Sequence, residues 1–282
     1  NLQETVLTIP QIGWKKPAGE AGTVTLTAHK GDQAGWIIEA FQVAAGDLEA
    51  TGRIRFAKES MSVREVEVDR LELDGSHLHG GLTVDERQAI RIQIAGSRLD
   101  LQRILPHVIQ PETETDQVEK ESPAIVSEMG RSLSFDVDID EIVLSQNVQL
   151  AMATATGLFD GEYWTNLQAE AQIGAESQGS FNFRPLEGEH RLTVQASDIG
   201  DVISQLMGSE EFAGGTLQIK GSRPSADDPI AGSFIVEDFR VLHSPVMLRL
   251  LAAVTLTKPL HNLQGNGLQF TVLKGNFTLE EG

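Results

Sequence analysis

Alternation of apolar and polar residues with a period of two recurs along this chain and limits its fold more than any other feature. In Ile90-Arg91-Ile92-Gln93-Ile94, three isoleucines face one way and two polar side chains face the other, as in a strand with one buried face. Similar runs occupy residues 23–28, 135–139, 167–173, 181–183, 192–196, 217–219, 234–241 and 268–272. Turn residues separate them at the spacing of antiparallel hairpins, for example Asp74-Gly75, Gly80-Gly81, Glu187-Gly188 and Gly214-Gly215. We therefore predict a mainly β fold.

Three segments have apolar residues at helical spacing instead. They are residues 99–109, residues 199–207 with Asp198 as the N-cap, and a segment that starts at Ser244-Pro245 and runs to Leu256. The third segment is apolar nearly all round, so it must be buried, or face another subunit or a lipid.

An internal repeat organises these elements. Residues 94–99 lie 100 residues before the similar residues 194–199, and each copy is predicted to run from a strand into a short helix. Repeats of this kind stack into long sheets. We expect an elongated, curved antiparallel β-sheet (a repeating β-groove) with a few short helices. Residues 1–110 would form a first β-repeat region ending in a short helix, residues 111–123 an acidic mobile loop, and residues 124–282 a second region.

Composition excludes several classes of function. The chain has 22 Lys and Arg against 41 Asp and Glu, a net charge of −19, which argues against nucleic acid as a partner. It has no cysteine, so disulfides and thiolate chemistry are excluded. No run of about 18 uncharged apolar residues is present, and both ends are abrupt, which favours a piece of a longer protein.

Two clusters of potential metal ligands have simpler interpretations. His77 and His79 share one side of a strand, but no third ligand is close in sequence, and we expect a solvated strand end before Gly80-Gly81. Asp136, Asp138 and Asp140 resemble the start of a calcium loop, but they alternate with apolar residues and fit the polar face of a strand better. No catalytic motif is present, so we predict no enzyme activity, no cofactor and no metal site.

The C-terminal part resembles a known family. Residues 214–221 (GGTLQIKG) precede residues 232–239 (GSFIVEDF), the proline-initiated segment 244–251 (SPVMLRLL) and residues 265–270 (GNGLQF). This order resembles the C-terminal region of AsmA-like envelope proteins, relatives of YhdP and TamB, over about residues 190–280. The resemblance implies a periplasmic β-rich body, anchored to the bacterial inner membrane by an N-terminal segment, that carries phospholipid or another acyl lipid toward the outer membrane and has envelope protein partners.

A lipid carrier needs a continuous apolar surface, because exposing two acyl chains to water costs on the order of 20 kcal/mol. Alternating strands supply such a surface if no second sheet covers it; a covered face would make an ordinary sandwich, and the sequence leaves both open. The candidate groove residues are Ile90, Ile92, Ile94, Val137, Ile139, Leu192, Val194, Leu217, Ile219, Phe234 and Val236. The candidate capping helix carries Val246, Leu250, Leu251 and Val254.

Two alternatives belong to other classes of function. The first is a structural or scaffolding β-repeat protein that organises envelope assembly through edge strands or the helix. The second is a glycan-active enzyme with two carboxyl groups about 5–10 Å apart in a cleft.

Overall fold

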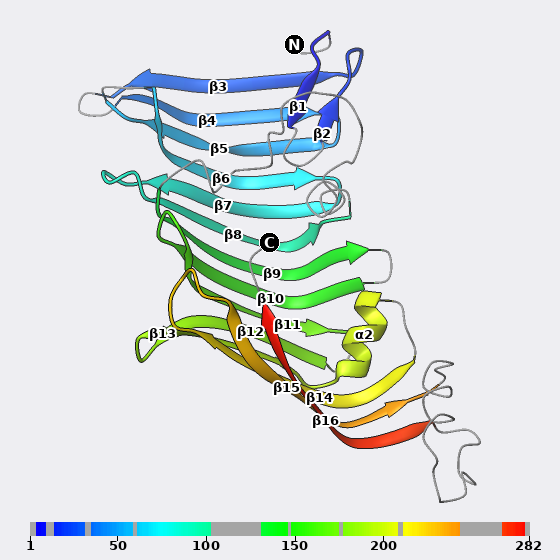
Figure 1. Ribbon diagram of the computed structural model, residues 1–282. Coiled ribbons are helices and arrows are strands. Elements are labelled where there is room, and N and C mark those ends of the chain that lie inside the picture. The colour runs from blue at the N-terminus through cyan, green and yellow to red at the C-terminus, as the bar shows by residue number, and fades with distance from the viewer. Residues whose placement is uncertain are drawn as a thin grey trace, which may run out of the picture. The chain divides into compact units, whose positions relative to one another are not determined.

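The computed structural model describes residues 4–9, 14–31, 35–58, 61–102, 131–145, 148–174, 177–207, 211–242 and 267–279. The chain is mainly β, with one short helix in these ranges (Figure 1). The elements are β1 (Leu7–Ile9), β2 (Trp14–Lys16), β3 (Gly22–Lys30), β4 (Trp36–Ala45), β5 (Leu48–Phe56), β6 (Val63–Leu73), β7 (Ser76–Val84), β8 (Ile90–Asp100), β9 (Leu133–Ser145), β10 (Val148–Phe159), β11 (Trp164–Ile173), β12 (Ser177–Leu186), β13 (Glu189–Ala196), α2 (Ile199–Met207), β14 (Phe212–Arg223), β15 (Ile230–Val241) and β16 (Leu268–Leu279).

Strands β3 to β16 form one 14-stranded sheet whose order follows the sequence, so the sheet is open and ends at β3 and β16. Strands β3 to β8 pair antiparallel in series, as do β11 to β16. Strands β8 and β9 pair in parallel. The predicted mainly β fold on an open antiparallel sheet is confirmed, with this one parallel pair as an exception.

The chain divides into two compact units. Unit 1 contains Asn1–Gln146 and Met152–Asn166, and unit 2 contains Asn147–Ala151 and Leu167–Gly282. The predicted acidic loop at 111–123 lies outside the described residues. The two units are treated separately below.

The helix predictions have three different outcomes. Helix α2 is confirmed, and Asp198 caps it because its Oδ1 accepts a hydrogen bond of 2.9 Å from the backbone N–H of Asp201. The helix predicted from residue 99 is wrong at its start, because Leu99 and Asp100 are still in β8, where they pair with Ile142 and Val143. Residues 103–109 and the candidate capping helix, with Val246, Leu250, Leu251 and Val254, lie outside the described residues.

Two of the predicted glycine turns are wrong. Gly80 and Gly81 lie inside β7, and Gly214 and Gly215 lie inside β14. At Gly80 the reason is close packing, because a Cβ atom would overlap the carbonyl oxygen of Gln93 on β8. Turns are present at Asp74-Gly75 and Glu187-Gly188, where both residues of each pair have positive φ.

Buried apolar clusters lie at two places on the sheet. In unit 1, Trp14 of the β1–β2 hairpin forms a cluster with Ala45 and Leu48, and Val43, Leu71 and Leu73 pack against this cluster. The hairpin crosses the ends of β3 to β5 in Figure 1. In unit 2, Val236, Phe239 and Val241 form a cluster against which Ile199 of α2 packs. Both clusters therefore form where a short element covers part of the sheet.

Candidate functional site

In unit 1 the strand register places apolar side chains in transverse rows on one face of the sheet, here called the apolar face of unit 1. The register connects each residue to a partner on the next strand from β3 to β9. The first row is Ala28, Ile38, Ile54, Val66, Leu82, Ile92 and Phe135; the second is Leu26, Phe41, Gly52, Val68, Gly80, Ile94 and Val137; the third is Val24, Val43, Ala50, Leu71, Leu78, Gly96 and Ile139. At about 4.8 Å per strand, each row extends about 29 Å.

Irregularities in the register keep these rows aligned. Register shifts occur between Ile38 and Phe41 on β4 and between Val68 and Leu71 on β6. Because paired residues share a face, the shift on β4 brings both Ile38 and Phe41 to the apolar face, although they are three positions apart. Simple alternation would have turned one of them to the other face.

Most side chains of these rows are only half-buried. Leu26 is 55% exposed and Val24 is 46% exposed, while Ile54, Val66, Leu82 and the other central members have intermediate exposure. Within the described residues, the β1–β2 hairpin is the only strand pair outside the main sheet, and it covers one end of this face. In the described part of unit 1, no second sheet covers the centre of the face, which fits a single-layer sheet and not a sandwich.

Phenylalanine rings lie over cross-strand glycines on this surface. A Cβ atom on Gly52 would lie 2.9 Å from the Phe41 ring, and one on Gly157 would overlap the Phe135 ring. Phe135 also meets Trp164 edge-on at 5.7 Å, and Trp164 lies 5.4 Å from Phe159. The missing side chain of each glycine therefore lets a flat ring lie directly on the sheet.

Unit 2 has an apolar face of the same kind, and pairing again aligns its rows from β11 to β16. The rows are Leu167, Phe183, Leu192, Gly221, Gly232 and Phe277; then Ala169, Phe181, Val194, Ile219, Phe234 and Gly275; then Ala171, Gly179, Ala196, Leu217, Val236 and Leu273. Helix α2 covers one end of this face through Ile199.

A cation lies at the other end of the apolar face of unit 2. The side chain of Arg223 is 4% exposed and its guanidinium stacks 5.0 Å from the centroid of Phe183. His190 stacks on the same ring at 5.3 Å. Arg223 Nη1 also donates a hydrogen bond of 2.9 Å to the carbonyl of Ala226, which holds the guanidinium in place.

All candidate groove residues predicted from the sequence lie in these rows or directly beside them. Ile90, Ile139, Leu192 and Val236 are buried. Ile92, Ile94, Val137, Val194, Leu217, Ile219 and Phe234 have intermediate exposure. The structure places the residues, but their role in binding lipid stays a prediction.

Sequence reasoning missed the part of the surface formed by β3 to β7. Leu26, Phe41 and Ile54 belong to the rows but were not among the candidates. Leu26 lies in the predicted run 23–28, but no residue of that run was chosen as a candidate. Register shifts on β4 and β5 interrupt the runs around Phe41 and Ile54 and break the period of two. The Trp14 hairpin was missed as well, because strands of three residues give no periodic signal.

The opposite face of unit 1 is polar and carries cross-strand ion pairs. Arg55 Nη1 lies 2.8 Å from Glu65 Oε2, and Arg53 pairs with Glu67 in bidentate fashion. Hydrogen bonding to Glu67 raises the pKa of Arg53, and the same bond lowers the pKa of Glu67. All of these groups lie at the surface, so the pairs contribute little stability each.

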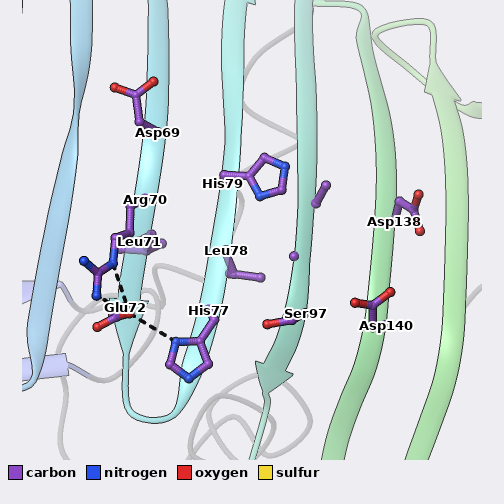
Figure 2. A pocket seen from close by; sticks show the side chains of 12 residues that line it. Asp69, Arg70, Leu71, Glu72, His77, Leu78, His79, Ser97, Asp138 and Asp140 are labelled. Carbon is purple, nitrogen blue, oxygen red and sulfur yellow. Dashed lines mark hydrogen bonds and ion pairs between the residues drawn. The ribbon is translucent and has the colours of Figure 1, made fainter.

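The two histidines, His77 and His79, lie on this polar face together with Asp138 and Asp140 (Figure 2). Two neighbouring open hollows of about 610 Å³ each share Asp69, His79, Ala95 and Asp138. The predicted strand end at His77 and His79 is wrong, since β7 continues to Val84. Asp136, Asp138 and Asp140 are exposed on β9, as predicted for a polar strand face.

Glu72 is the most connected carboxylate of these hollows. Arg70 Nη2 donates to Glu72 Oε1 at 2.6 Å, and His77 Nδ1 lies 3.4 Å from the same oxygen. Hydrogen bonding to Arg70, and then the smaller contribution of His77, lower the pKa of Glu72. No three His, Asp or Glu side chains converge on a metal geometry within the described residues.

Comparison with known proteins finds no counterpart: no family model, curated protein or solved structure matches this chain. Among the described residues, no helix has the length and apolar character needed to cross a bilayer.

Proposed function

We propose that this protein binds phospholipid on the apolar faces of its sheet and belongs to the non-enzymatic, AsmA-like lipid-handling proteins of the bacterial envelope. One observation carries the proposal: rows of apolar side chains run in register across seven strands of unit 1 and remain half-exposed. Large exposed apolar surfaces mark binding sites in soluble proteins. An acyl chain laid on such a surface gains about 0.8 kcal/mol for each CH₂ removed from water.

The resemblance of residues 190–280 to AsmA-like proteins supports the assignment of location. The resemblance implies a periplasmic protein that is attached to the inner membrane through another segment and transfers lipid toward the outer membrane. No catalytic step is required, because the proposed work is the shielding of acyl chains.

Site-specific crosslinking tests the proposal directly. A photoreactive residue is introduced as Ile92→p-benzoylphenylalanine, and the matched control is Gln93→p-benzoylphenylalanine. Ile92 lies in the first row, while Gln93 is the next residue and is exposed on the polar face. We expect phospholipid adducts from position 92 and none from position 93, by mass spectrometry of protein purified from bacterial envelopes. Equal labelling, or no lipid at either position, would overturn the proposal.

A pair of charge substitutions gives an independent test. Ile92→Asp and Val194→Asp place a carboxylate in the half-exposed rows of units 1 and 2, and Gln93→Asp and Gln195→Asp place it on the opposite face. We expect Ile92→Asp and Val194→Asp to lose bound lipid with modest loss of stability, because their side chains keep access to water. Outright unfolding of both, with the controls intact, would indicate a closed core instead.

The second candidate is a scaffold that binds envelope proteins through its sheet edges. Strand β3 is an edge and is exposed along nearly its whole length, and unpaired edges accept strands from other chains. Protein adducts from a photoreactive residue on this edge, such as Thr25→p-benzoylphenylalanine, with no lipid adducts from position 92, would favour this candidate.

A further inference from the structure

The two ends of the apolar face of unit 1 carry opposite charge. Because β3 to β8 alternate in direction, the ends of β3, β5 and β7 lie beside the starts of β4, β6 and β8, and the parallel β9 starts at the same edge. This edge carries Lys30, Lys58, Arg64, Arg87 and Arg131, here called the basic rim. The opposite edge carries Glu20, Asp47, Asp74 and Asp100, here called the acidic rim.

Cations predominate at the basic rim. Its carboxylates within the described residues are Asp85 and Glu86, and Asp85 already accepts hydrogen bonds from the backbone N–H groups of Arg87 and Ala89 at 2.8 and 2.9 Å. Within the described residues the basic rim therefore has five cations and two carboxylates, and Asp32 and Glu59 of the sequence lie outside the described residues. Arg64 is held at this rim by a hydrogen bond of 3.1 Å from Nη1 to the carbonyl of Val84.

Exposed apolar groups accompany these cations. Trp36, which pairs with Lys30 at the start of β4, is 47% exposed. Met61, between β5 and β6, is 70% exposed. A combination of basic side chains and exposed tryptophan is typical of protein surfaces that meet the headgroup region of lipids.

The Trp14 hairpin covers the acidic rim at β4 to β6, and the carboxylates of this rim are unfavourable for a phosphate. Trp14 packs there on Ala45 and Leu48, and its Nε1 donates to Asp47 Oδ1 at 2.8 Å. Lys16 lies in the same hairpin but is buried, and its ammonium donates to the carbonyls of Thr5 and Pro17. The ammonium of Lys16 is thus directed into the hairpin, which leaves Lys15 as the exposed cation of this strand.

We infer that the phosphate of a bound diacyl lipid lies at the basic rim of unit 1, with its acyl chains running along the strands toward the Trp14 hairpin. This inference rests on the proposed lipid-binding function. Along β4, from Trp36 at the basic rim to Val43 at the hairpin cluster, the strand rises about 23 Å at 3.3 Å per residue. One leaflet of a bilayer core is about 15 Å deep, so an extended acyl chain fits between the rim and the hairpin.

Neutralising the rim tests the position of the phosphate. The double variant Arg87→Gln with Arg131→Gln removes two exposed cations of the rim. The control Arg91→Gln with Arg184→Gln removes two exposed arginines away from the rim, Arg91 on the polar face of unit 1 and Arg184 on β12 of unit 2. At low salt we expect binding of dipalmitoyl phosphatidylglycerol to weaken about five-fold per rim cation. Binding of dipalmitoylglycerol, which lacks the phosphate, should stay unchanged. The control variant should keep the wild-type preference for dipalmitoyl phosphatidylglycerol over dipalmitoylglycerol.

The results distinguish the two proposals. If the wild-type protein binds neither lipid, the proposed function fails. Two other results would refute only the position of the phosphate, provided that the wild-type protein binds both lipids. In the first, the rim variant keeps the wild-type preference for the phospholipid; in the second, the control variant loses that preference as much as the rim variant does.

Bromine atoms on the acyl chains report the direction of the lipid through tryptophan quenching. The variant Trp14→Phe with Trp164→Phe retains Trp36 at the basic rim, and Trp36→Phe with Trp164→Phe retains Trp14 at the hairpin. We expect bromines next to the ester groups to quench Trp36 and bromines near the chain ends to quench Trp14. Quenching in the reverse order, or equal quenching by both lipids, would overturn the inferred orientation.

Discussion

Substitution of Gly157 by alanine should destabilise unit 1, because the Phe135 ring occupies the space that a side chain would need. A Cβ atom at Gly157 would overlap Phe135 Cε1 and lie 2.6 Å from its Cζ. The ring is held in place by its edge-on contact with Trp164 at 5.7 Å. Overpacking of this kind costs about 1–3 kcal/mol, while the lower entropy of the unfolded alanine chain offsets about 0.4–1 kcal/mol.

The expected net loss is therefore about 1–2 kcal/mol in the free energy of unfolding. Urea denaturation followed by circular dichroism, which reports on both units, measures it. Gly179→Ala in unit 2 is the control, because a Cβ there would press only on the flexible Ile173 Cδ1 at 2.9 Å. Combining Gly157→Ala with Phe135→Leu should recover part of the loss through a coupling energy. An unchanged stability for Gly157→Ala, or strictly additive effects in the double variant, would refute the argument.

Three further predictions concern local structure. Trp14→Ala should cost about 3–5 kcal/mol in the stability of the hairpin region, measured as lost hydrogen-exchange protection at β4 and β5. Asp198→Ala removes the N-cap of α2 and should cost about 1 kcal/mol, measured by urea denaturation. Arg70→Gln should raise the pKa of Glu72 toward its ordinary value, measured by NMR titration. The pKa of Glu72 is lower in the folded protein than in the unfolded chain. The small stabilisation by its ion pair with Arg70 is therefore fully present above the pKa of Glu72 in the unfolded chain, and it is lost as the pH falls through the pKa of Glu72 in the folded protein.

Regular alternation made much of the sheet predictable. The runs at Ile90–Ile94 and at 135–139 lie in β8 and β9, and α2 begins after its predicted cap, Asp198. In these segments local pattern and tertiary environment agree, because one face meets apolar neighbours and the other meets water. The candidate groove residues could be named for the same reason, since each belongs to an uninterrupted run.

Long-range pairing decided what the sequence did not reveal. Leu99 has a helical pattern around it, yet it extends β8 because Ile142 of the parallel strand β9 lies beside it. Gly80 looks like a turn residue, but a neighbouring backbone demands glycine there. Likewise, the basic rim joins Lys58, Arg87 and Arg131 from three separate turns, which only the strand order brings to one edge.

The charge of the chain bears on what can cover its apolar faces. A half-exposed row such as the one containing Ile54 and Val66 would gain free energy by packing against the same row of a second copy. Each copy, however, carries a net charge of −19, so bringing two copies together face to face meets mutual repulsion over distances comparable with the Debye length of about 8 Å. The acyl chains of a lipid offer the same apolar contact, and its single phosphate adds far less negative charge than a second copy of the chain. The exposed rows and the acidic composition, taken together, therefore favour lipid over self-association as the occupant of these surfaces.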